Sequence, residues 1–193
     1  MNQPVATQIR KAYRVRGKTL VLRNAEVKDA EFILSLRTDG RKAMYLTQTS
    51  PELQRQIEWL KGYAEKTDQA YFIIESQAGA PLGTVRLYDP QGDSFCWGSW
   101  VLAADAPGAA AIESALMVYA YATEHLGFQA SHFDVRKGNE RVWRFHERFG
   151  AVRVAASDLD YFYQIAREKI LLARTRYKKY LPESVEVEQQ YEH

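Results

Sequence analysis

The sequence predicts an α/β fold in which a central mixed, mostly antiparallel sheet of about seven strands is flanked by helices, with an extra helix near the C-terminus. Short β-branched and aromatic runs form a meander between residues 71 and 102, separated by turns rich in Gly, Pro and Asp. After residue 108, long helical periodicities alternate with strand-like runs. A chain of 193 residues is also long enough to bury one sizeable core.

In the first half, a strand and two helices precede the meander. Residues 18–23 (KTLVLR) predict a strand, and residues 29–36 predict a helix. Ser50 and Pro51 open a second helix that runs to about residue 66, because Ser caps helices and Pro suits the first helical position. Gly98 predicts a bulge or a close backbone approach in the third meander strand. The meander strands are expected at 71–76, 82–88 and 95–102.

The second half contains a crossover and a final helix. An Ala-rich helix over residues 108–126, ended by Gly127, connects two strands as a βαβ unit. The sequence predicts an N-terminal extension at 1–16, a main domain at 17–166, and a C-terminal helix with an acidic tail at 167–193 that frays from residue 183. The remaining expected elements are strands at 131–136, 151–155 and 161–165 and helices at 139–149 and 167–181.

Composition limits the partners of the chain. The 26 basic and 24 acidic residues nearly balance, which gives no electrostatic case for nucleic acid. Cys96 is the only cysteine, so the chain has no internal disulfide, and no His, Cys or Asp spacing predicts a metal site. The N-terminus does not read as a signal peptide, and charges interrupt the apolar stretch 102–126, so we expect a cytoplasmic protein without membrane insertion.

Two stretches carry candidate chemistry. In the first, the small residues from Asp105 to Ala110 lead from a strand into the long helix, where backbone N–H groups and the helix dipole favour a phosphate. An ordinary strand-to-helix connection is the alternative. In the second, a strand ends in residues 134–139 (DVRKGN) and a helix follows, so that Asn139 either caps this helix or donates to a ligand. His146 lies two turns further on the same helical face.

Together these stretches resemble the GCN5-related N-acetyltransferases, the GNAT family. In that family a Gln/Arg-x-x-Gly-x-Gly/Ala loop wraps the pyrophosphate of acetyl-CoA, and residues 105–110 match it except for Asp105. A later family motif, Asn-x₅-aromatic-Tyr-x₃-Gly-Phe, is matched by Asn139, Phe145 and Gly150, with His146 in place of Tyr and Ala151 in place of Phe. A narrower resemblance, carried by residues 37–39, 98–101 and 134–139, is to acetyltransferases that act on nucleotide-linked amino sugars in surface-glycan pathways.

The resemblance implies direct attack of a small-molecule amine on the thioester of acetyl-CoA, without a metal. The expected acceptor is an amino sugar carried on a nucleotide, and the resemblance allows a homodimer. Acetylation of a peptide or another amine, and a non-catalytic acyl-CoA-binding sensor, remain alternatives. The implied coenzyme contacts are Trp100, Val101, Leu102, Pro107, Gly108, Ala109, Ala110, Asn139 and Phe145.

His146 is the expected catalytic acid, facing the thiolate, because it aligns with the family Tyr and an imidazole titrates near neutral pH. The base is open. Glu75 is the first candidate, and Asp93, Glu113 or a water chain could also serve. Cys96 is rejected as an acyl carrier, since a lone Cys in an aromatic strand is more often a core residue.

The expected substrate contacts come mostly from the first two helices and their connection. Arg37 and Arg41, together with Lys42, would bind a diphosphate, because guanidinium groups pair bidentately with phosphate oxygens. Rings can stack on a base or a sugar. The alternative for the cations is a solvated helix end, and for the rings it is core packing. The expected uncharged contacts are Tyr45, Gln48, Tyr71 and Trp97.

Overall fold

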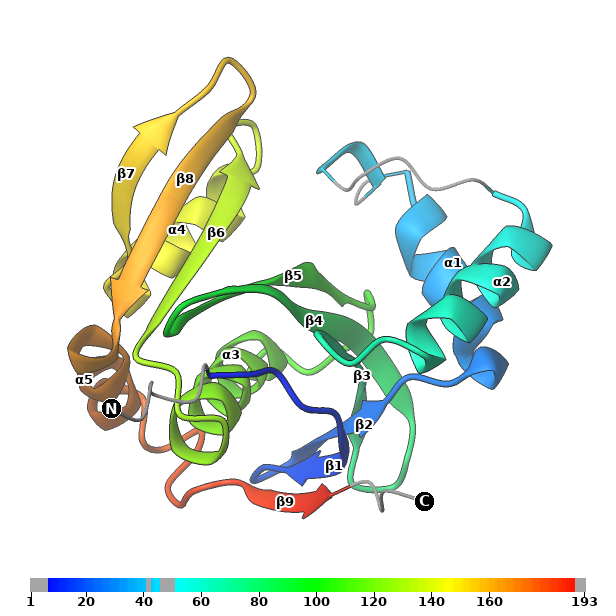
Figure 1. Cartoon of the computed structure of the whole chain (residues 1–193), viewed down its shortest axis with the longest axis horizontal. Helices are drawn as coiled ribbons and strands as arrows, with labels where there is room; N and C mark the ends of the chain where they lie inside the picture. The colour runs from blue at the N-terminus through cyan, green and yellow to red at the C-terminus, as the bar shows by residue number, and fades with distance from the viewer. Residues whose placement is uncertain (1–6, 41–42, 46–50, 190–193) are drawn as a thin grey trace, which may run out of the picture.

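The computed structural model describes residues 7–40, 43–45 and 51–189, and these residues build one nine-stranded sheet flanked by five α-helices (Figure 1). The strand order is β7-β8-β6-β5-β4-β3-β2-β1-β9. The strands are β1 (Ala12–Arg16), β2 (Leu20–Asn24), β3 (Ala70–Ser76), β4 (Pro81–Gln91), β5 (Ser94–Leu102), β6 (Ala130–Arg136), β7 (Val152–Ala156), β8 (Asp160–Ala166) and β9 (Glu186–Gln189). The α-helices are α1 (Ala30–Thr38), α2 (Leu53–Ala64), α3 (Ala110–Ala120), α4 (Glu140–Phe149) and α5 (Arg167–Arg176).

The expected mixed, mostly antiparallel sheet is confirmed. Every neighbouring pair of strands is antiparallel except β5 and β6, which pair in parallel and are joined through α3. The predicted helix 108–126 continues after α3 as a π-helical turn, η3 (Tyr121–His125), and Gly127 follows it with a positive φ of 87°. The sequence predicted this crossover because a long helix separates the two strands, and parallel neighbours need a long connection of this kind.

Two strands lie outside the seven that the sequence predicts. Strand β1 falls in the expected N-terminal extension, and β9 falls in the acidic tail, so the expected fraying is wrong for residues 186–189. The two strands pair with each other, and Glu188 of β9 forms ion pairs with Arg14 at 3.7 Å and Arg16 at 2.7 Å. Opposite charges on neighbouring strands favour this pairing, which neither segment signals alone. Both flanking segments therefore join the central sheet, while the domain boundaries at 17 and 167 remain predictions.

Alternation along β3 separates two cores. Phe72 and Ile74 belong to the main core, which also contains buried residues of α3, α4 and α5. Tyr71 and Ile73 face the opposite way into a smaller core beneath α1 and α2. Successive residues of a strand point to opposite faces, so the sheet carries helices on both sides at β3.

The face opposite α3 to α5 is only partly covered. Figure 1 shows α1 and α2 beside β2 to β4, whereas β6, β7 and β8 turn that face to solvent. Phe162 on β8 accordingly has 39% of its surface exposed, and Val152 on β7 has 59%. We call this side of the sheet the open face, and the side of α3, α4 and α5 the helix side. Within the described part of the chain, no helix is both long and apolar enough to cross a membrane.

Candidate active site

The candidate site forms where β5 and β6 separate. Their pairing is limited to Ser94, Phe95 and Cys96 of β5 against residues 130–132 of β6, although β5 continues to Leu102 and β6 to Arg136. Beyond Cys96 the two strands diverge (Figure 1). The expected coenzyme edge at Trp100 and Val101 lies in this diverging part of β5.

A bulge in β5 sits at the point of divergence. The register between β4 and β5 shifts, because Thr84 faces Val101 while Arg86 faces Gly98. Ser99 takes up the extra residue with a positive φ of 47°, and the Thr84 hydroxyl donates a 2.7 Å hydrogen bond to its carbonyl oxygen. A Cβ on Gly98 would lie 3.1 Å from the Tyr88 hydroxyl. Of the two expectations for Gly98, the bulge is confirmed, and the group that lies close to Gly98 is the Tyr88 side chain rather than a backbone.

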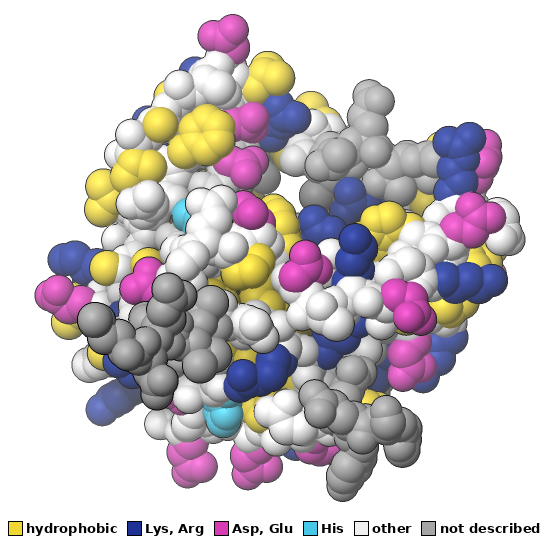
Figure 2. All heavy atoms as spheres, in the orientation of Figure 1, with side chains coloured by type: hydrophobic (Ala, Val, Ile, Leu, Met, Phe, Trp, Pro, Cys, Tyr) yellow, Lys and Arg dark blue, Asp and Glu magenta, His cyan; other side chains and the backbone are white. Residues whose placement is uncertain are grey.

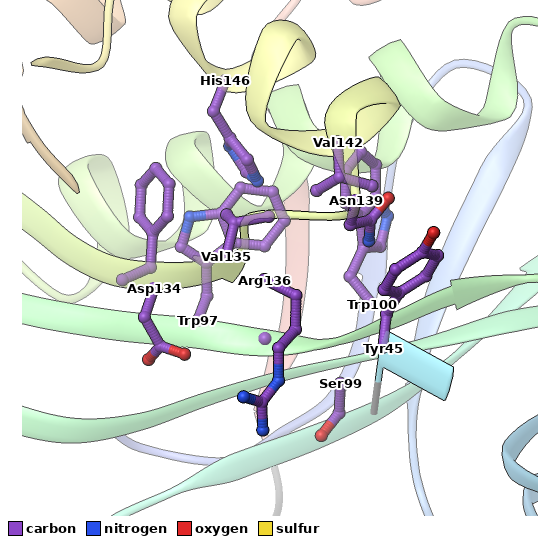
Figure 3. Close-up of a pocket in the computed structure, with 12 residues that line it drawn as sticks. Tyr45, Trp97, Ser99, Trp100, Asp134, Val135, Arg136, Asn139, Val142 and His146 are labelled. Carbon is purple, nitrogen blue, oxygen red and sulfur yellow. The ribbon is translucent and has the colours of Figure 1, made fainter. Parts of the chain in front are cut away.

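A cavity of about 150 Å³ lies in this gap. Residues of β6 line it from both sides of the sheet, because Val135 faces the helix side while Asp134 and Arg136 face the open face. In Figure 3 His146 reaches into the cavity from one side, and the charged groups of Asp134 and Arg136 point to the other. The lining residues are Tyr45, Trp97, Gly98, Ser99, Trp100, Phe133, Asp134, Val135, Arg136, Asn139, Val142 and His146.

His146, the expected acid, stands in an aromatic wall. Its ring centroid lies 4.2 Å from that of Phe133, 5.2 Å from Trp97 and 5.9 Å from Trp100. Only 5% of the residue is exposed, and its Nδ1 atom has no hydrogen-bond partner among the described residues. Burial lowers the pKa of His146 to about 3, because an apolar surrounding disfavours the imidazolium. The ring is therefore neutral at neutral pH and offers a neutral N–H or a lone pair to a bound group.

Asn139 and Tyr45 frame the entrance beside α4. Asn139 is the N-cap residue of α4, but its side chain makes no capping hydrogen bond and lines the cavity instead. Of the two roles that the sequence left open for Asn139, the structure fits ligand contact. Tyr45 reaches the turn before α4, where its ring lies 3.2 Å from the position of a Cβ on Gly138. The connection between α1 and α2 thus meets the β6–α4 turn at the cavity.

Three further expected coenzyme contacts, Trp100, Leu102 and Phe145, pack against the main core on the helix side. The indole of Trp100 donates to the Ser114 hydroxyl of α3 at 3.1 Å, and its ring centroid is 5.0 Å from that of Phe145. In the loop before α3, the Ala110 N–H donates to the Pro107 carbonyl at 2.9 Å. Nothing lies within 4 Å of a Cβ placed on Gly108, so this backbone is open to close approach. The loop and the diverging edge of β5 therefore fit a phosphate-bearing coenzyme that lies along the strand.

Cations gather on the open face beside the cavity, where Arg86 of β4 lies opposite the lining residue Gly98. Burial raises the pKa of Tyr71, and the neighbouring Arg37 and Arg86 oppose this rise, which places both guanidinium groups near one hydroxyl. Figure 2 shows basic side chains around the hollow between the two halves of the molecule. Sequence reasoning missed Arg86, whose guanidinium lies 4.2 Å from the ring centroid of Tyr88. Alternation along β4 could have indicated its position, because its neighbours Val85 and Leu87 are core residues and Arg86 must therefore face the other side of the sheet.

Several expected site residues have other surroundings. Glu75, the first candidate base, does not line the cavity; its carboxylate accepts a 2.7 Å hydrogen bond from Arg23, which also pairs with Asp29 at 2.8 Å. Glu113 accepts hydrogen bonds from the backbone N–H groups of Thr19 and Leu20, which fixes the β1–β2 turn. These two carboxylates are held by structural partners, which leaves them poorly suited to proton transfer.

The stacking role expected of two rings is not supported by their burial. Tyr71 is 2% exposed and packs edge-on against Trp59 and Tyr63, and Trp97 is 4% exposed and forms part of the cavity wall. Cys96 is buried, and burial raises the pKa of its thiol to about 11, which fits its rejection as a nucleophile. The predictions for Arg41, Lys42 and Gln48 fall outside the described residues.

The comparisons with known proteins agree with the fold. Residues 19–152 match the family model described as "Acetyltransferase (GNAT) domain". A solved structure described as apo FdhC, a nucleotide-linked sugar GNAT, is 36% identical, with a TM-score of 0.79 over 88% of this chain and 99% of its own. The chain therefore belongs to the GNAT family, and it is an acyl-CoA-dependent N-acetyltransferase.

More distant structures share the fold. A GCN5-related N-acetyltransferase from Brucella melitensis is 16% identical, with a TM-score of 0.75 over 92% of this chain and 90% of its own. A chimeric spermidine N-acetyltransferase SpeG from Vibrio cholerae and hSSAT is 17% identical, with a TM-score of 0.69 over 80% of this chain and 99% of its own. Among curated proteins, no sequence matches the chain.

Proposed function

We propose that the chain transfers the acetyl group of acetyl-CoA to the amine of an amino sugar carried on a nucleotide. The observation that carries this proposal is the 36% identity to FdhC, a nucleotide-linked sugar GNAT, over nearly the whole of that protein. The cations on the open face support it, because a nucleotide diphosphate brings two negative phosphates that guanidinium groups bind well. Arg37 and Arg86 would bind this diphosphate.

The coenzyme is assigned to the helix side. Acetyl-CoA supplies the activated acetyl thioester. Its pyrophosphate would meet the backbone between Pro107 and Ala110 at the start of α3, and its pantetheine chain would lie along β5 at Trp100 and Val101. Asn139 would then donate to the thioester end from the N-terminus of α4. His146 would hydrogen-bond there as a neutral imidazole, so the rate would not depend on forming its imidazolium.

A polyamine acceptor is less favoured by the charges at the site. The likeness to the spermidine acetyltransferase is a likeness of fold at 17% identity. A polycation is expected to require several carboxylates, whereas Asp134 is the one acidic side chain among the described residues that line the cavity. The cationic open face would repel such a substrate.

A CoA-release assay with acetyl-CoA tests the proposal. The acceptor panel would contain 3-amino and 4-amino sugars on a nucleoside diphosphate, the same sugars without the nucleotide, spermidine and short peptides. We expect turnover of one nucleotide-linked amino sugar and a large loss when the nucleotide is removed. Equal turnover of the free sugar, or turnover of spermidine or peptide alone, would contradict the proposed acceptor.

A further inference from the structure

One carboxylate, that of Asp134, lines the cavity from the open face. Asp134 lies in β6 between Phe133 and Val135, which are both buried on the helix side. Alternation turns Asp134 to the open face, and Figure 3 shows its carboxylate pointing away from His146. It is the one acidic side chain among the described residues lining the cavity.

The cavity passes through the sheet at this point. It is lined by His146 from the helix side and by Asp134, Arg136 and Ser99 from the open face. An acetyl thioester that lies along β5 would present its carbonyl carbon in the gap between β5 and β6. An amine that approaches from the open face would reach this carbon beside Asp134.

We propose that Asp134 is a catalytic residue that pairs with the ammonium group of the acceptor and takes up the proton that this nitrogen must lose before attack. This inference rests on the proposed function for the identity of the acceptor. The freed nitrogen lone pair forms a bond to the thioester carbonyl carbon, and the carbon–sulfur bond breaks. The second nitrogen proton goes to the departing sulfur, and Asp134 releases its proton to solvent. The products are an amide, free CoA thiol and one proton.

The surroundings of Asp134 favour this role. Burial and the neighbouring Asp160 of β8 raise the pKa of Asp134, and Arg136 opposes the rise. Asp134 is nevertheless exposed at the open face, so an acceptor can reach its carboxylate, and the raised pKa makes it a stronger base than an ordinary Asp. Tyr88 of β4 and Cys96 of β5 also face it, and burial raises the pKa of both. These two groups therefore stay protonated at neutral pH, which leaves the Asp134 carboxylate free to accept a proton.

The test compares Asp134→Asn with a matched control, Asp89→Asn. Asp89 is an exposed carboxylate on β4 that pairs with His132 at 3.3 Å and does not line the cavity. Its φ is 47°, a conformation that Asn adopts readily. Each variant is assayed across pH with the acceptor that the wild type turns over best, and acetyl-CoA binding and the circular dichroism spectrum are recorded in parallel.

For Asp134→Asn we expect kcat/KM for the amine to fall about 100-fold or more at neutral pH, with acetyl-CoA binding and folding unchanged. The deficit should shrink as the pH rises past the pKa of the acceptor amine, because the amine then arrives neutral. A merely structural role would give a deficit that does not depend on pH. Asp89→Asn should keep wild-type rates.

The outcomes separate this inference from the proposed function. If the wild type acetylates only spermidine but Asp134→Asn loses that activity in a pH-dependent way, the acceptor is wrong and the role of Asp134 stands. If a nucleotide-linked sugar is acetylated and Asp134→Asn stays within twofold of the wild type at every pH, the role of Asp134 is overturned alone. A wild type that acetylates no amine in the panel overturns both.

Discussion

The two sides of the cavity differ in chemistry although one strand, β6, contributes to both. On the helix side, Phe133 and the rings of Trp97 and Trp100 surround a neutral His146. On the open face, Asp134 and Arg136 present opposite charges. This contrast follows from the period of two along a strand combined with the loss of pairing after Cys96.

In the proposed arrangement, the difference would keep the two substrates apart. The aromatic wall would exclude water from the thioester end and would strengthen hydrogen bonds made there. The polar face would receive a charged acceptor without stripping every polar group of its hydration. The gap between β5 and β6 is where these two environments meet, and the bulge at Ser99 widens the ladder at that point.

The largest expected effect concerns His146. Replacing it with Ala should lower turnover by a factor of about 10²–10⁴ while leaving acetyl-CoA binding nearly intact, because the neutral imidazole would be the hydrogen-bonding group at the thioester end. Since burial lowers the pKa of His146 to about 3, the wild-type rate should show no limb near pH 6.5 from this ring. Steady-state kinetics from pH 5 to 9 check both statements.

His125→Ala serves as the control for that experiment, since His125 lies on η3 and does not line the cavity. His146→Gln, which keeps a polar side chain of similar length, guards against misfolding of the Ala variant. An unchanged rate in a folded His146 variant would show that the buried imidazole on the helix side takes no part in the reaction.

Stability should depend on the helix side more than on the open face. Trp97→Ala removes a buried indole from the aromatic wall and should cost about 3–5 kcal/mol of unfolding free energy, because a cavity remains. Arg136→Ala on the open face removes a half-exposed ion pair with Asp160 and should cost at most about 1 kcal/mol. Urea unfolding of both variants measures the difference, and equal losses would contradict the comparison.

Acid should destabilise the fold through His146. Its pKa is about 3 in the folded chain and about 6.5 when unfolded, so between these values the unfolded chain binds the extra proton. Stability is therefore present above pH 6.5 and is lost as the pH falls toward 3, by about 2 kcal/mol between pH 7 and pH 5 from this group. Urea unfolding of wild type and His146→Gln at both pH values measures it. An equal pH dependence in the two proteins would assign the effect to other groups.

The smallest expected effect concerns acceptor affinity on the open face. Arg86→Met keeps much of the side-chain volume but removes the charge, and it should raise KM for the nucleotide-linked acceptor about tenfold, equivalent to about 1.4 kcal/mol. KM for acetyl-CoA should not change, because the coenzyme is assigned to the helix side. Arg55→Met on the exposed face of α2 is the control, since Arg55 pairs with Glu52. A rise in KM for both substrates would contradict the assignment of the acceptor to the open face and of the coenzyme to the helix side.

Local sequence signals were sufficient for much of the fold. Gly98 predicted the bulge in β5, and the crossover helix was marked by its Ala-rich run and Gly127. The strands at the two ends were missed because β1 and β9 carry charges whose pairing partners lie more than 170 residues apart in sequence, as with Arg16 and Glu188. Long-range pairing of this kind leaves no local pattern.

The sequence predicted only part of the site, because the contacts between distant parts of the chain again leave no local pattern. His146, Asn139, Trp97 and Trp100 were named from sequence and line the cavity, as does Tyr45. Glu75 was named as a base, but its strand places it beside Arg23. The sequence alone pointed to no role for Asp134 or Arg86, because a strand of mixed residues does not show which of its faces will border a cavity.

By itself, the sequence determined the class of fold, the order of its central elements and the family, because these depend on local periodicity, glycine positions and short motifs. The tertiary structure decided which charged groups meet across the gap between β5 and β6. It also decided that His146 is buried among rings and neutral, while Glu75 is tied in an ion pair. Burial and charge pairing depend on residues brought together from distant parts of the chain, and only folding establishes those neighbours.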